Sequence, residues 1–193
     1  MQKNDVHPEE AISLDATDVQ AYTGKGDILY EIKRYEEALL TYEQALRLDP
    51  TSAEAYNGKA ISLVFLGRHE EALAAYEQVI RLDDDEPVYS YLAYVNSSTI
   101  LATLSRYEEA LAASEGAIRF EPRHAHNHVS KGWLLERLAR HEAALAAYQE
   151  ASRIEPGDAD IWRSIGDVLT SLERPQEAQQ AYEKARQLDS GHP

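Results

Sequence analysis

The feature that most constrains this chain is a phrase that returns along it at nearly fixed intervals. It reads RYEEALLTYEQALRLDP at 34–50, RHEEALAAYEQVIRLDD at 68–84 and RYEEALAASEGAIRFEP at 106–122. The alanine of each EEAL-like stretch recurs with spacings of 34, 38, 34 and 34 residues, at Ala38, Ala72, Ala110, Ala144 and Ala178. A repeat of this length corresponds to one supersecondary unit, so the sequence predicts a stacked array of five such units.

Each copy contains two amphipathic helical patterns. In the first copy Tyr22, Gly26 and Leu29 recur at intervals of three and four residues, which is the periodicity of one helix face. A second pattern of the same kind starts near Ala38. For the helix starts, Thr51 is predicted to form a capping box with a glutamate three residues later, and Asp158 to cap a later helix. Each copy is therefore predicted to be a helix-turn-helix.

Small and large residues alternate at matching places in the copies. Small residues recur in the first helices, at Gly26, Ala60, Ser98, Gly132 and Gly166. Large partners recur in the second helices, at Tyr42, Tyr76, Tyr148 and Tyr182, with Ser114 in the third copy. Glycine in a helix interior is unfavourable by about 1 kcal/mol relative to alanine, so its recurrence predicts a close approach between helices.

This pattern resembles the tetratricopeptide repeat (TPR) family, in which aromatic, small and proline residues recur over 34 residues. Tyr22, Gly26, Ala38, Tyr42 and Pro50 match it in the first copy, and the resemblance covers nearly the whole chain. It implies an all-α fold, a right-handed α-α superhelix or TPR solenoid. Ser114 and His128, which stand where the pattern has aromatic residues, depart from it and are expected to weaken single contacts.

The predicted domain organisation follows the spacing of the copies. Five repeats fill 19–192, at 19–52, 53–86, 91–124, 125–158 and 159–192, with a four-residue insertion at 87–90. Four residues add roughly one helical turn, so a lengthened helix is predicted over about 86–104. Residues 1–18 align with the end of a repeat and are predicted to be a partial repeat or N-terminal capping helix.

Composition excludes several classes of function. With 34 acidic and 19 basic residues the formal net charge is −15, which disfavours nucleic acid and anionic membranes as partners. The chain has no cysteine, hence no disulfide and no thiolate nucleophile. The longest apolar run, AISLVFL at 60–66, is too short to span a bilayer. We therefore expect an acidic cytoplasmic protein.

Motifs for catalysis or metal binding are incomplete. HEEAL at 69–73 and HEAAL at 141–145 lack the second histidine of a zinc-binding helix. His124 and His128 are four residues apart and remain weak metal candidates, because two ligands do not complete a zinc site. We expect neither a cofactor nor an enzyme.

The face of the first helices opposite the packing positions is the remaining candidate surface. In the TPR family this concave surface binds peptides or partner segments, so the resemblance implies a peptide-binding groove here. The residues predicted to form it are Asn57, Ile61, Val64, Phe65, Val95, Asn96, Thr99, Val129, Trp133 and Arg137. The apolar members would form a docking strip, and the asparagines suit a partner's main chain. The same residues could instead contact adjacent first helices, and the sequence leaves both interpretations open.

The predicted function is a non-enzymatic scaffold that binds a protein or peptide segment in this groove. The alternative is self-assembly, in which the repeat ends associate into a homo-oligomer. That alternative starts from the expectation of an uncovered apolar face near Leu188, since terminal repeats of solenoids usually carry a polar cap.

Overall fold

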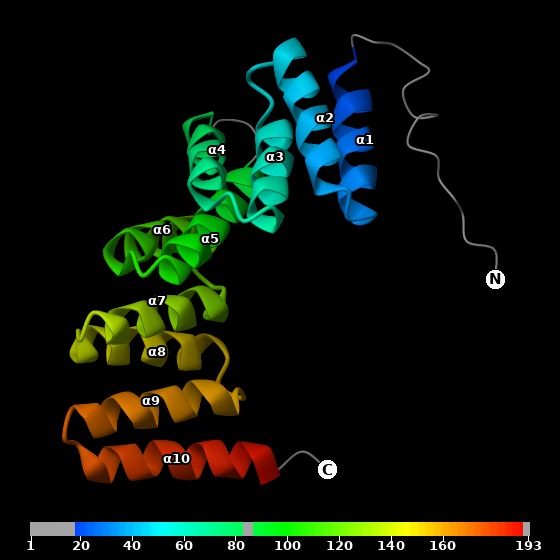
Figure 1. Ribbon diagram of the computed structural model, residues 1–193. Coiled ribbons are helices and arrows are strands. Elements are labelled where there is room, and N and C mark those ends of the chain that lie inside the picture. Colours follow the sequence, from blue (N-terminus) through cyan, green and yellow to red (C-terminus); the bar gives the residue numbers. More distant parts are fainter. Residues whose placement is uncertain (1–17, 83–86, 191–193) are drawn as a thin grey trace. The chain divides into compact units, whose positions relative to one another are not determined.

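The computed structural model describes residues 18–82 and 87–190, which form ten helices and no strand (Figure 1). The helices are α1 (Val19–Glu31), α2 (Tyr35–Leu48), α3 (Ala53–Phe65), α4 (His69–Arg81), α5 (Pro87–Thr103), α6 (Tyr107–Phe120), α7 (Ala125–Arg137), α8 (His141–Ile154), α9 (Ala159–Ser171) and α10 (Pro175–Ser190). The all-α prediction is confirmed. Within the described stretches, no helix combines the length and apolarity needed to cross a bilayer.

The helices fall into two compact units, with the boundary inside α5 between Ala93 and Tyr94. In the first unit α1 packs on α2 and α3, and α3 also packs on α2 and α4. In the second, each helix from α6 to α10 packs on the next one along the chain. Each unit is therefore a stack of helix hairpins.

Helix α5 has 17 residues, whereas α1, α3, α7 and α9 have 13 each. This is the extra length that a four-residue insertion gives, and it matches the helix predicted over 86–104. Residue 86 lies outside the described residues, as do residues 1–17, where the partial repeat is predicted.

The turn inside each hairpin has the same backbone geometry. One residue per turn has a positive φ, at Lys33, Gly67, Ser105, Ala139 and Glu173. In the fourth turn the Ala139 N–H donates to the Glu136 carbonyl at 2.8 Å, and the Arg140 N–H donates to the Leu135 carbonyl at 2.8 Å. These two bonds are those of a Schellman motif, which satisfies the last carbonyls of the first helix. Glycine suits this position best, yet it occurs at only one of the five.

Ala139→Gly is expected to raise the free energy of unfolding by about 0.5–1 kcal/mol. The left-handed conformation costs a non-glycine residue about 1–2 kcal/mol, of which part is offset by the greater freedom of glycine in the unfolded chain. Ala139 has φ 55° and is exposed, so no packing is lost. The matched control is Ala146→Gly, an exposed position in the interior of α8, which should lose about 1 kcal/mol. Urea denaturation measures the change in the free energy of unfolding of both variants. Changes of the same sign in the two variants would contradict the prediction.

Three of the first helices, α1, α3 and α9, are capped at their starts by short polar side chains. Asp158 accepts a hydrogen bond from the Asp160 N–H at 2.8 Å, so its predicted cap is confirmed. The capping box predicted at Thr51 is wrong. Ser52 caps α3 instead, with its Oγ accepting from the Ala55 N–H at 3.1 Å, while Thr51 donates to Asp49.

Tyrosine rings pack on glycines in three of the hairpins. A Cβ added at Gly26 would lie 2.5 Å from the Tyr42 ring, and one added at Gly58 would lie 2.4 Å from the same ring. The pairs Gly132 with Tyr148 and Gly166 with Tyr182 are equally close. The predicted pairing of small and large residues is thus confirmed for these three hairpins.

Candidate functional site

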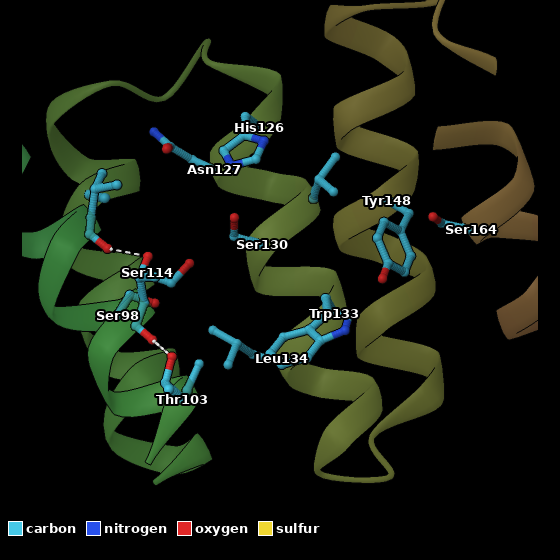
Figure 2. Close-up of a pocket in the computed structure, with 15 residues that line it drawn as sticks. Ser98, Thr103, Ser114, His126, Asn127, Ser130, Trp133, Leu134, Tyr148 and Ser164 are labelled. Carbon is cyan, nitrogen blue, oxygen red and sulfur yellow. Dashed lines mark hydrogen bonds between the residues drawn. The ribbon is translucent and has the colours of Figure 1, made fainter. Parts of the chain in front are cut away.

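A cavity of about 500 Å³ opens within the second unit. Its walls come from five successive helices (Figure 2), and the lining residues are Val95, Ser98, Thr99, Ala102, Thr103, Ser114, Ala117, His126, Asn127, Val129, Ser130, Trp133, Leu134, Tyr148 and Ser164. Ser98 and Ser114 come from α5 and α6, and Ser130, Trp133 and Leu134 come from α7. The space therefore lies where the third hairpin meets the fourth.

The lining carries hydroxyl, amide and apolar groups and the imidazole of His126, but no carboxylate, lysine or arginine. The Ser98 hydroxyl donates to the Ala110 carbonyl at 2.9 Å, and Asn127 Nδ2 donates to the Glu121 carbonyl at 3.2 Å. The Ser114 side chain is 3% exposed, and its hydroxyl has no hydrogen-bond partner in the described part of the chain. A buried hydroxyl without a partner is unfavourable by about 1–3 kcal/mol, so a bound group that pairs with it would gain affinity.

Tyr148 forms one wall and is held in place from both ends. Its ring lies against Gly132, and its hydroxyl donates to Glu136 Oε2 at 2.6 Å. Burial, followed by the hydrogen bond to the Glu136 carboxylate, raises the pKa of Tyr148 above its ordinary value. The phenol therefore stays neutral, and this wall of the cavity is uncharged.

A smaller cavity of about 180 Å³ in the first unit is built from the same repeat positions. Seven of its lining residues lie 72 positions before seven that line the larger cavity. In the smaller cavity they are Asp27, Tyr30, Tyr42, Glu54, Asn57, Gly58 and Ile61. In the larger cavity they are Thr99, Ala102, Ser114, His126, Val129, Ser130 and Trp133. The two spaces are therefore repeats of one site with different side chains.

The residue at 42 or 114 is one contributor to the difference in volume, beside the eight lining residues of the larger cavity that have no counterpart in the smaller one. Tyr42 is 2% exposed, lies between Gly26 and Gly58, and donates from its hydroxyl to Asp27 Oδ1 at 2.7 Å. At the equivalent place the second unit has only the small side chain of Ser114. From the sequence, this substitution was expected to weaken one contact. The structure shows that it also leaves a space, because the adjacent helices do not close over it.

The cavities bring together some of the sequence-predicted groove residues. Val95, Thr99, Val129 and Trp133 line the larger cavity, where Trp133 is 45% exposed. Asn57 and Ile61 line the smaller one. Asn57 is only 8% exposed, and its Oδ1 has no partner among the residues described. Val64 and Asn96 are half-buried and belong to neither lining.

Two further predicted residues lie on aromatic clusters beside the cavities. Phe65 is 54% exposed and stacks on Tyr35, with ring centroids 4.7 Å apart. At the equivalent positions in the second unit the Arg137 guanidinium lies 5.4 Å from the Tyr107 ring centroid, which is a cation–π contact. Hydrogen bonding with Ser105 and then with Arg137 lowers the pKa of Tyr107. Both clusters flank the first helices that line the cavities.

The histidines considered as metal ligands have other contacts. His128 Nε2 lies 2.9 Å from the Pro122 carbonyl oxygen, as Trp162 Nε1 lies 3.1 Å from that of Pro156. His128 thus takes the place of an aromatic residue, as expected. His124 precedes α7 and its ring contacts that of His126. No group of three or more possible metal ligands occurs within the described ranges.

Several residues that line the larger cavity were not predicted as site residues. Ser98, Ser114 and Tyr148 were assigned to packing alone, and Ala117 and Asn127 were not considered. The sequence did carry one usable signal, which was serine at 114 in a column of tyrosines.

Comparison with known proteins agrees with the helical hairpins. A family model described as Tetratricopeptide repeat matches residues 57–125 and 129–193, and one described as TPR repeat matches 26–64. None of the curated proteins gives a significant match.

Solved structures share the fold at low sequence identity. YrrB, described as a TPR protein with an unusual peptide-binding site, is 23% identical, with a TM-score of 0.79 over 96% of this chain and 93% of its own. A MamA segment from Desulfovibrio magneticus RS-1 is 19% identical, with a TM-score of 0.77 over 90% of this chain and 96% of its own. Another MamA crystal structure is 20% identical, with a TM-score of 0.80 over 89% of this chain and 92% of its own.

Proposed function

The chain belongs to the tetratricopeptide repeat family, and we propose that it is a non-enzymatic scaffold that binds an extended segment of a partner protein at the larger cavity. The observation that carries the proposal is the cavity itself. Its lining has no carboxylate, lysine or arginine, has hydroxyl, amide and imidazole groups beside apolar ones, and is bordered by a half-exposed tryptophan. These are the features of sites that hold a side chain by burial and a backbone by hydrogen bonds.

Three of the predicted groove residues contribute in distinct ways. Trp133 offers a large surface that is partly exposed, and such tryptophans often dominate the affinity of an interface. Val95 and Val129 add apolar contacts from α5 and α7. The peptide-binding site in the description of YrrB adds support by analogy of fold.

The test uses a random peptide library displayed on phage, selected against the purified chain. Peptides that bind should lose at least tenfold in affinity against the double variant Asn96→Ala/Trp133→Ala, because a buried tryptophan contact is worth roughly 2 kcal/mol or more. Leu40→Ala is the matched control, since Leu40 is 59% exposed but lies on a second helix. Failure to select any peptide, or equal affinity for the double variant, would contradict the proposal.

The alternative of self-assembly through the repeat ends has weaker support. Apart from Pro175, the exposed side chains of α10 are charged or polar, and Leu188 is half-buried. An uncovered apolar face was the reason for expecting end-to-end association, and α10 does not present one. Sedimentation over a wide concentration range would detect such association directly.

A further inference from the structure

We propose that the larger cavity receives an aromatic side chain, a tyrosine or phenylalanine ring, from the bound partner segment. The ring would occupy the space that the tyrosine at the equivalent position fills in the other repeats. This inference rests on the proposed function, because it identifies which part of the partner is recognised and where.

The first argument is the match between the two cavities. Seven lining positions recur 72 residues apart, and at the position where Tyr42 places a ring the second unit has Ser114. In the first unit the Tyr42 ring therefore occupies the site, and a cavity of about 180 Å³ remains beside it. The second unit has about 500 Å³, so a ring can enter without displacing a side chain of the chain itself.

The second argument is the chemistry of the lining. A cationic side chain would be desolvated there without a counter-charge, because no carboxylate lines the cavity, and an anionic one would meet only the His126 imidazole. A ring would contact Val95, Val129 and Leu134 and could meet Trp133 edge to face, a favourable aromatic geometry. The Ser114 hydroxyl, which is buried and without a partner in the described residues, can pair with a polar atom of the occupant.

The third argument excludes the two neighbouring tyrosine rings of the chain as occupants. Tyr148 holds the repeat position of Ser114 in the next hairpin, but its ring packs on Gly132 and its hydroxyl is bonded to Glu136. Tyr94 lies over Gly116, where an added Cβ would be 2.3 Å from its ring, and it contacts Phe120. Neither ring is placed to enter the space, so we assign the occupant to the partner.

The first experiment titrates the intact chain with 4-methylphenol, the side chain of tyrosine as a free molecule, followed by calorimetry and by amide NMR shifts. We expect a Kd on the order of 1 mM, as for a small ligand with few atoms. Shifts should centre on Ser98, Ser114, Ser130 and Trp133. Absence of binding, or shifts confined to other residues, would overturn the inference.

The Ser114→Tyr variant places a ring in the cavity and should weaken 4-methylphenol binding at least tenfold. Ser171→Tyr adds the same side chain at an exposed position of α9 and should leave the affinity within twofold. If Ser114→Tyr does not give the wild-type circular dichroism spectrum, Ser98→Gly/Ser114→Tyr replaces it, because it recreates the glycine–tyrosine pair of three other hairpins. Undiminished binding to the folded blocking variant would overturn the inference.

The second experiment separates this inference from the proposed function. Peptides selected against the wild type should contain an aromatic residue whose change to glycine weakens binding at least tenfold. On the folded blocking variant the same change should have less than a twofold effect. Peptides that need Trp133 but no aromatic residue of their own would overturn the inference and leave the proposed function standing. Failure to select any peptide, with 4-methylphenol still bound, would overturn the proposed function and with it the assignment of the ring to a partner segment.

Discussion

Replacing Tyr42 with serine is expected to lower the free energy of unfolding by about 3–5 kcal/mol, the range for removing a buried aromatic ring. The ring is 2% exposed and fills the space between Gly26 and Gly58. Its removal would leave a cavity continuous with the existing one of about 180 Å³. The substitution reproduces, in the first unit, the residue that the second unit has at 114.

The control is Tyr42→Phe, which keeps the ring and removes only the hydroxyl bonded to Asp27 at 2.7 Å. It should cost about 1 kcal/mol. Urea denaturation followed by far-UV circular dichroism measures both variants. Both tryptophans, Trp133 and Trp162, lie in the second unit, so their fluorescence reports that unit separately. A loss in the serine variant no larger than in the phenylalanine variant would show that the ring is not what fills this space.

Gly26→Ala is expected to destabilise the chain by about 1–3 kcal/mol, the usual effect of overpacking a core. The added Cβ would lie 2.5 Å from the Tyr42 ring. The ring cannot move away, because Gly58 is equally close and the hydroxyl is bound to Asp27. Ala60 holds the equivalent place in the second hairpin, so the restriction is specific to a ring enclosed by two glycines.

Gly24→Ala is the matched control in the same helix. No atom lies within 4 Å of the position of its added Cβ, so the better helix propensity of alanine should stabilise the chain by up to about 1 kcal/mol. The two alanine variants should therefore differ in sign, as measured by urea denaturation. In the Tyr42→Ser background the cost of Gly26→Ala should largely disappear, because the clash and the ring are removed together. A cost that persists in that background would mean that the strain comes from the helix itself.

The fold could be predicted from the sequence because the same residue pattern recurs five times. Each helical pattern is a weak signal alone, but five copies that agree predict the fold even where one copy has an atypical residue. The lengthened α5 was predicted in the same way, from four extra residues between two copies. Helix starts were less predictable, because Thr51 and Ser52 are adjacent and both are good caps. The structure selects Ser52, as the Thr51 hydroxyl and N–H are bound to Asp49.

The arginines at the hairpin turns show a second limit of prediction from the sequence. Their positions in the sequence indicate only positive charges that suit the C-terminal ends of the first helices. In the structure four of them pair with the glutamate three residues later, as Arg174 does with Glu177 at 2.7 Å. Arg140 has alanine at that distance and reaches Glu108 of the preceding hairpin instead, also at 2.7 Å. These pairs are exposed, so each adds little to stability.

The candidate site was predictable only in part. Trp133, Val95, Thr99 and Val129 could be placed on one surface from helical geometry alone. The volume of the cavity could not be predicted, because it depends on fifteen side chains from five helices and on the spacing between those helices. Serine at 114 signalled a difference, but a sequence does not tell whether neighbours close over a missing ring or leave it open.

The equivalence of Tyr42 and Ser114 also bears on how such arrays acquire new specificity. A tyrosine codon can become a serine codon by a single nucleotide change, so one mutation can turn an internal packing position into a cavity that can bind a side chain. The hairpin backbone is the same in both states, and each of the four tyrosines at this repeat position offers the same opportunity. A repeat array of this kind carries a set of latent binding sites, each occupied by the chain's own side chain until that side chain is lost.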